Sequence, residues 1–412
     1  MENTKRVKLA CYFVNVSMAI VCNLSPVLFL TFNSLYNISF TLLGTLVFVG
    51  FFTQLIVDII FSLFSHKFNI PLVVKLIPVL TISGLVLYAL SPFIFPNNTY
   101  VGILIGTFIF AASSGCAEVL ISPVIAAIPS ENPEREMSKL HSIYAWGVVG
   151  VIIISTLFLT AFDKTYWWIL PLIFCLAPLF SLIMFLTSSL PHLETPEKAS
   201  GAIGYFKNKW LWFCFLAIFL GGAAECTMAQ WSSGFLESAL GIPKIWGDIF
   251  GVALFAVFLG LGRTLYSKFG KNIGKVLFFG AILASACYFV AIFSPLPIFG
   301  LIACALTGFA VSMMWPGCLI VATDKIPNAN VLVFAMMAAG GDLGASLSPQ
   351  LVGIIKDQIQ SSEVGTKMAE FFNLPIGEFS LRFGMLVGLL LCIVSIFVYL
   401  TIMLSYKKKK NG

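Results

Sequence analysis

The chain has 412 residues, of which 59% are hydrophobic and only 10% are charged. Ordinary soluble domains carry about 25% charged residues, so this composition excludes a water-soluble globular protein. Apolar runs of about 20 residues, each long enough to cross a bilayer, recur along the whole length. The sequence therefore predicts an all-α polytopic membrane protein.

Twelve such runs are separated by turns rich in proline, asparagine and glycine. The longest polar interval on one side of the predicted membrane follows the sixth run and contains two prolines. We therefore expect a six-helix bundle at residues 1–190, a linker at 191–209 and a second six-helix bundle at 210–412 that ends in a lysine-rich tail. A small surface helix is expected between residues 356 and 380. The predicted transmembrane spans are residues 9–32, 41–65, 71–95, 101–128, 140–162, 167–190, 210–236, 247–268, 274–294, 297–323, 331–355 and 381–405.

Lysine and arginine are unevenly distributed between the two sides of the predicted membrane. If the N-terminus lies in the cytoplasm, 19 of the 24 basic residues fall on the cytoplasmic side. Cytoplasmic loops of membrane proteins carry such an excess of positive charge. We therefore expect both termini in the cytoplasm and the protein in the cell membrane. The net charge of +6 is a signal of topology, and no nucleic-acid partner is expected.

The two halves show a weak parallel repeat. Pro123 in the fourth span precedes Gly147 in the fifth by 24 residues, and Pro316 in the tenth precedes Gly340 in the eleventh by the same interval. Parallel repeats of six helices are a known plan of secondary transporters, in which the substrate site lies near the midplane between the repeats. The repeat therefore favours a transporter.

Each half also has a basic turn after its second span, with Lys67 in the first half and Lys268 in the second. Together with the six-plus-six division of twelve spans, these turns resemble those of the major facilitator superfamily. They depart from the family pattern, because His66 and Ser267 stand where the family has aspartate. Within the superfamily, the chain resembles the fucose-permease-like group of proton-coupled sugar symporters. The segments that carry this resemblance are Glu118 ahead of a helix proline, Leu140–Gly147 at the start of the fifth span, and Gly341–Gly344 with Ser348–Gln350 in the eleventh.

Two glutamates that interrupt apolar spans are candidates for proton coupling. A carboxylate inside a membrane is costly and is therefore a functional candidate. Glu118 lies about midway along the fourth span, and the resemblance implies that it is the proton-binding acid. The alternative is a glutamate bonded to a polar group of a neighbouring helix. Glu225 lies in the seventh span, where it is a second proton or cation site, a ligand for the substrate, or a structural contact between helices.

Five further charged residues are expected to gate the conformational change or to hold helices together. Asp58 and Asp342 lie in the second and eleventh spans, which the resemblance implies are neighbours, and Arg263 lies near the cytoplasmic end of the eighth. An unpaired charge at these depths is costly. We therefore expect the three to form ion pairs or to bond the basic turns that hold Lys67 and Lys268.

Aromatic and amide side chains within the spans are candidate contacts for a sugar. An aromatic face suits the C–H face of a sugar ring, and an amide suits its hydroxyl groups. The alternative for each aromatic is packing, or a place in the interfacial aromatic belt. The candidates are Trp231, Gln230, Trp315, Trp146, Tyr144, Gln54 and Gln350.

These features predict a secondary active transporter that moves a small polar solute, with a sugar as the first candidate, by alternating access with proton coupling. Two alternatives remain open: a proton-driven efflux carrier for amphipathic or drug-like compounds, and a membrane solute sensor without transport. The sequence holds no glycine-rich phosphate-binding loop and no grouping of nucleophile, base and metal ligands, so no enzyme, metal or cofactor is expected. The expected partners are the solute, protons and the lipid bilayer.

Overall fold

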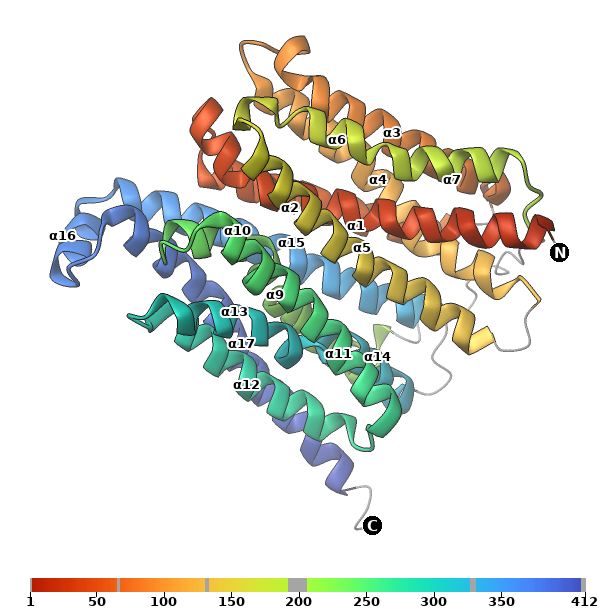
Figure 1. The fold of residues 1–412 in the computed structure, drawn as a ribbon. Coiled ribbons are helices and arrows are strands. Elements are labelled where there is room, and N and C mark those ends of the chain that lie inside the picture. The colour runs from red at the N-terminus through yellow and green to blue at the C-terminus, as the bar shows by residue number, and fades with distance from the viewer. Residues whose placement is uncertain (1, 65–66, 130–132, 192–205, 327–330, 409–412) are drawn as a thin grey trace. The chain divides into compact units, whose positions relative to one another are not determined.

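The computed structural model describes residues 2–64, 67–129, 133–191, 206–326 and 331–408 (Figure 1). The regular structure within these ranges is helical, without a β-strand. Eleven helical stretches of the described chain are long and apolar enough to cross a membrane. Helix α15 (Val331–Ser361) covers the remaining predicted span. The all-α polytopic architecture is therefore confirmed.

The chain folds as two compact units. Unit 1 contains residues 1–38 and 49–200, and unit 2 contains residues 39–48 and 201–412. This division differs from the predicted bundles in residues 39–48, which pack within unit 2. Most of the predicted linker, residues 192–205, lies outside the described part of the chain.

Unit 1 contains the first six spans, and the sixth is interrupted. Helices α6 and α7 meet at Cys175, because Pro178 has no N–H to donate to the carbonyl of Phe174 four residues earlier. The helices are α1 (Glu2–Tyr36), α2 (Phe40–Phe64, with its first turns in unit 2), α3 (Ile70–Ile94), α4 (Thr99–Ala126), α5 (Pro133–Ala161), the 3-10 helix η2 (Lys164–Tyr166), α6 (Ile169–Phe174) and α7 (Leu176–Leu186).

Unit 2 contains the last six spans, and two of these are interrupted. The eighth includes a π-helical turn, and the tenth is divided near Ser312. Pro316 causes the second break, because it cannot donate to the Ser312 carbonyl. The expected surface helix is present as α16. The elements are α9 (Lys209–Ser238), α10 (Lys244–Trp246), η3 (Gly247–Ala253), α11 (Leu254–Phe269), α12 (Ile273–Phe293), α13 (Pro297–Val311), α14 (Met314–Lys325), α15, α16 (Glu363–Phe371) and α17 (Ile376–Lys408).

Helices α3 and α4 pack closely and fix the orientation of α4. A Cβ at Gly84 would lie 2.7 Å from the backbone nitrogen of Phe110, closer than real Cβ contacts allow. Only glycine permits this approach, as it does in other membrane helix pairs. The hydroxyl groups of Thr81 and Ser113 lie 2.6 Å apart across the same contact. The rotation of α4 is thereby set, and with it the face that α4 presents to α2.

Candidate functional site

Two polar pairs face each other across α2 and α4 in unit 1. Gln54 and Asp58 are one turn apart on α2, so they share one face of that helix. Ser114 and Glu118 have the same spacing on α4. The Ser114 hydroxyl donates a hydrogen bond to Gln54 Oε1 at 3.2 Å. Gln54, which the sequence suggested as a substrate contact, is buried and is held by this bond.

The acids of these two pairs, Asp58 and Glu118, lie close together. A carboxylate oxygen of Asp58 is within 4.8 Å of one of Glu118. Gly115 allows the helices to come this close, because a Cβ there would lie 2.9 Å from the Cβ of Val57. Asp58 is buried, whereas Glu118 is exposed. Two carboxylates at this separation repel each other when both are ionised, so the presence of one favours protonation of the other.

Apolar residues of α4 next to this polar pair lie in the core of unit 1. Cys116, Ala117, Leu120 and Ile121 are buried in one apolar cluster with side chains of α1, α2 and α3. Their spacing along the helix is that of a single buried face. This packing anchors α4, whereas Glu118 itself is exposed beside the cluster.

Glu225 and Arg263 form an ion pair in unit 2. Arg263 Nη2 donates to both carboxylate oxygens of Glu225, at 3.3 and 3.2 Å. The Arg263 side chain is 42% exposed and that of Glu225 is 16% exposed. The sequence indicated separate roles for these two residues, and the structure brings them together from α9 and α11. The pair gives Glu225 the interhelical contact that was one of its three expected roles.

The break in the tenth span explains where the rest of the Arg263 side chain binds. Its Nε donates to the carbonyl of Ser312 at 3.1 Å. This is the carbonyl that Pro316 cannot bond, and buried backbone carbonyls are normally satisfied. Gly262 lets α11 approach closely enough, because a Cβ there would overlap the Ser312 side chain. The guanidinium therefore connects α9, α11 and the α13–α14 junction.

Two predicted substrate contacts bind the start of α2 within unit 2. Trp231 is fully buried. Its indole N–H donates to the Pro349 carbonyl at 3.0 Å, and its ring stacks on Phe40 with centroids 6.0 Å apart. The Gln350 amide donates to the Thr41 carbonyl at 3.4 Å. In this state of the protein, both side chains are engaged with other parts of the chain.

The other candidate substrate contacts have different surroundings. On α5, Tyr144 is half-buried and Trp146 is 70% exposed. On α9, Gln230 is buried. Trp315 on α14 is half-buried, and its indole ring lies against the backbone of Gly341. Of these four, Trp146 is the most accessible aromatic.

The remaining predicted gating charges lie in two kinds of environment. Asp342 is buried in α15. Lys67 and Lys268 are exposed at the basic turns, and the Lys67 ammonium lies 5.0 Å from the centre of the Phe64 ring. The expected bonding between the acids and the basic turns stays a prediction.

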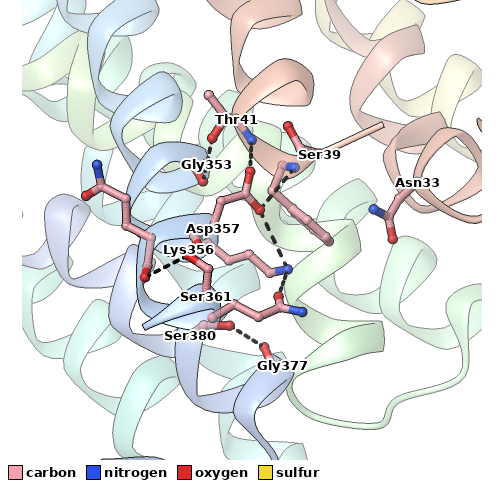
Figure 2. A network of polar contacts seen from close by, with 12 residues as sticks. Asn33, Ser39, Thr41, Gly353, Lys356, Asp357, Ser361, Gly377 and Ser380 are labelled. Atoms are coloured by element: carbon pink, nitrogen blue, oxygen red, sulfur yellow. Dashed lines mark hydrogen bonds and ion pairs between the residues drawn. The ribbon is translucent and has the colours of Figure 1, made fainter. Parts of the chain in front are cut away.

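Sequence reasoning missed Asp357, whose carboxylate accepts hydrogen bonds from the backbone of Phe40 and Thr41 (Figure 2). An acid near the end of a predicted span looks like an ordinary solvated charge. Its partners lie more than 300 positions earlier in the sequence, so no local pattern points to them. The available signal was the first turn of α2, whose N–H groups require acceptors.

Comparisons with known proteins agree with this architecture. The family model described as Major Facilitator Superfamily matches residues 9–349. An uncharacterized MFS-type transporter of Yersinia pestis is 24% identical over 282 residues, which cover 67% of this chain and 71% of that protein.

Solved structures resemble the chain over almost its whole length. A bacterial homologue of the human lysosomal transporter Spinster has a TM-score of 0.74 at 14% identity and covers 97% of this chain and 96% of its own. A D-xylose–proton symporter has a TM-score of 0.72 at 18% identity, with 95% and 96% covered. A variant of the Escherichia coli fucose–proton symporter has a TM-score of 0.55 at 17% identity, with 94% and 98% covered. At these identities the structures show a shared fold.

Proposed function

Because the chain belongs to the Major Facilitator Superfamily, we propose that it is a secondary active transporter that moves a small polar solute together with protons. Membership makes the protein an integral membrane transporter and not an enzyme. A sugar is the solute class that we propose first. Alternating access between the two sides of the membrane is the proposed mechanism.

The observation that carries proton coupling is the Asp58–Glu118 pair. The two carboxyl groups come within 4.8 Å in one unit, and Glu118 is exposed while Asp58 is buried. A proton that reaches Glu118 relieves the repulsion between the pair. Binding and release of that proton change the charge that the unit holds at this depth, which is what a coupling site must do.

Two further findings support a sugar as the solute. The fold is shared with symporters of D-xylose and fucose. Within the chain, Trp146 and Tyr144 offer aromatic faces that are not fully buried, and aromatic faces suit sugar rings. The Glu225–Arg263 pair offers both a donor and an acceptor for hydroxyl groups.

The proposed location is the cell membrane with both termini in the cytoplasm. This orientation rests on the distribution of basic residues, 19 of 24 on one side. It makes α1 run from the cytoplasm outward, so α2 begins at the outer face.

Solute-induced proton movement tests the proposal. The purified protein is reconstituted in liposomes that hold a pH-sensitive dye, and D-xylose, L-fucose, D-glucose and a nucleoside are added outside in turn. We expect at least one sugar to acidify the interior and the nucleoside to leave it unchanged. Acidification by the nucleoside alone would contradict the sugar assignment. Uptake of labelled sugar without any proton movement would contradict the coupling.

A further inference from the structure

The guanidinium of Arg263 is held in one orientation within unit 2. Its Nε donates to the Ser312 carbonyl at 3.1 Å, and its Nη2 donates to the two carboxylate oxygens of Glu225 at 3.3 and 3.2 Å. A guanidinium is planar and presents its N–H groups in a rigid fork. Contacts at two of its nitrogens therefore fix the plane of the group and the direction of the third nitrogen, Nη1, before any solute binds.

Nη1 is the part of this guanidinium that remains available. It carries two N–H donors, and it makes no hydrogen bond to any residue in the described ranges. The Arg263 side chain is 42% exposed. Its partner Glu225 lies near the middle of α9, and exposed charges at such a depth face water and not lipid. The donors of Nη1 are thus oriented in advance and accessible to a dissolved molecule.

The break in the tenth span also positions an aromatic ring. Trp315 follows Ser312, the residue whose carbonyl Arg263 binds, by three residues. On α9, a Cβ at Gly222 would lie 3.1 Å from the Trp315 ring. Gly222 precedes Glu225 by three residues, so the two share one face of the helix, and three residues of α-helix rise about 4.5 Å. The ring and the ion pair therefore meet α9 within about one turn of each other.

The chemistry of these groups fits a sugar that carries a carboxylate. A guanidinium binds a carboxylate through charge-assisted hydrogen bonds, which are stronger than those between neutral groups. Trp315 is half-buried, and an aromatic face suits a sugar ring. A phosphate also suits a guanidinium, but it brings more negative charge beside ionised Glu225, and like charges at short range repel each other. The single charge of a carboxylate keeps this repulsion smaller.

We propose that the solute is a sugar acid, whose carboxylate binds Nη1 of Arg263 while its ring lies against Trp315. The inference rests on the proposed function, because it names the solute class of that transporter. Glu225 has two effects in this site. It balances the charge of Arg263 before the solute binds, and it weakens the attraction between Arg263 and a carboxylate once the solute is there.

Binding to the purified full-length protein in detergent tests the solute class. Thermal-shift titrations give Kd for D-glucuronate and D-glucose, which differ in carrying a carboxylate or a hydroxymethyl group at the same carbon. We expect wild type and the control Glu363→Gln, which changes an exposed acid on α16, to bind glucuronate about tenfold more tightly, the scale of one charge-assisted hydrogen bond. Equal affinities, or no binding of glucuronate, would overturn the proposal. Tighter binding of D-glucose 6-phosphate than of glucuronate would overturn it as well.

Glu225→Gln separates a bound carboxylate from a bound hydroxyl group by the sign of its effect. The variant keeps an acceptor for Nη2 and leaves the bond from Arg263 to Ser312 intact, so the site stays assembled. Removal of the opposing charge should make glucuronate bind several-fold more tightly and leave the affinity for glucose unchanged. Weaker binding of glucuronate would show that Glu225 itself accepts a hydrogen bond from the solute, and would overturn the proposal.

Trp315→Leu tests the ring contact separately. It should weaken the binding of glucuronate and glucose by the same factor, because both sugars present the same ring to the indole. Unchanged affinity for both sugars would contradict this contact.

The sugar-acid inference and the proposed function can fail separately. Proton movement driven by D-glucose in liposomes, with no binding of glucuronate, would overturn the inference and leave the proton-coupled transporter standing. Preferential binding of glucuronate without proton movement would support the inference and contradict the coupling.

Discussion

Replacing Arg263 with methionine removes three hydrogen bonds, two from Nη2 to Glu225 and one from Nε to the Ser312 carbonyl. The carbonyl is the more serious loss, because Pro316 cannot replace the donor. A buried acceptor left unsatisfied costs about 1–3 kcal/mol. The ion pair is partly hydrated, so its loss adds roughly 1 kcal/mol at most. We expect Arg263→Met to lower the stability of the protein by about 2–4 kcal/mol.

Glu225→Gln provides the matched comparison. Its amide oxygen still accepts from Arg263, and the bond from Arg263 to Ser312 is untouched, so the loss should be about 1 kcal/mol or less. The double variant should lose less than the sum of the single variants by about 1 kcal/mol, since the two residues share one contact.

Chemical unfolding of the purified variants in mild detergent, followed by tryptophan fluorescence, gives the order of stability. The expected order of loss is Arg263→Met first, the double variant close behind it, and Glu225→Gln last. Equal losses in the two single variants would refute the role of the Ser312 carbonyl. Strict additivity in the double variant would refute the ion pair.

Two other predictions concern packing and charge in unit 2. A Cβ at Gly344 would overlap the Phe219 carbonyl, so Gly344→Ala should cost about 1–3 kcal/mol. Gly50 has open space around it, so the control Gly50→Ala should be neutral or slightly stabilising. Equal thermal midpoints for the two variants would show that α9 and α15 do not need this close approach. Lys244 pairs with Asp248 at 3.1 Å, and the Asp248 side chain is 1% exposed, so Lys244→Met removes an ion pair from a buried carboxylate and should cost about 3 kcal/mol. Asp248→Asn keeps an acceptor for Lys244 and should cost less, and the reverse order in a thermal unfolding series would contradict this reading.

Most of the transmembrane spans could be predicted from the sequence, but not every break within those spans could be predicted. The runs of apolar residues are long enough to be unambiguous. The breaks near Cys175 and Ser312 were visible in principle, because Pro178 and Pro316 remove the backbone donors there. The π-helical turn at Gly247–Ala253 has no such signal in the residue types, since its backbone pattern is chosen by the packing around it.

Single residues of the site were easier to predict than the pairs they form. Glu118 was conspicuous because a carboxylate in an apolar helix is costly. Its proximity to Asp58 could not be predicted, because α2 carries apolar residues on both its buried and its exposed faces. The sequence therefore does not reveal which face of α2 points toward α4. The same ambiguity hid the pairing of Glu225 with Arg263. It also hid the engagement of Trp231 with the start of α2.

The Asp58–Glu118 pair is the centre of the proposed mechanism, and Glu118→Gln tests it most directly. The variant is reconstituted beside wild type and Glu363→Gln, and accumulation of the labelled sugar that acidified the wild-type liposomes is measured under an imposed inward proton gradient. Exchange of internal for external sugar is measured without a gradient. We predict that Glu118→Gln abolishes accumulation above the external concentration but retains exchange, while Glu363→Gln retains both. Wild-type accumulation in Glu118→Gln would contradict the assignment of Glu118 as the proton-coupling residue.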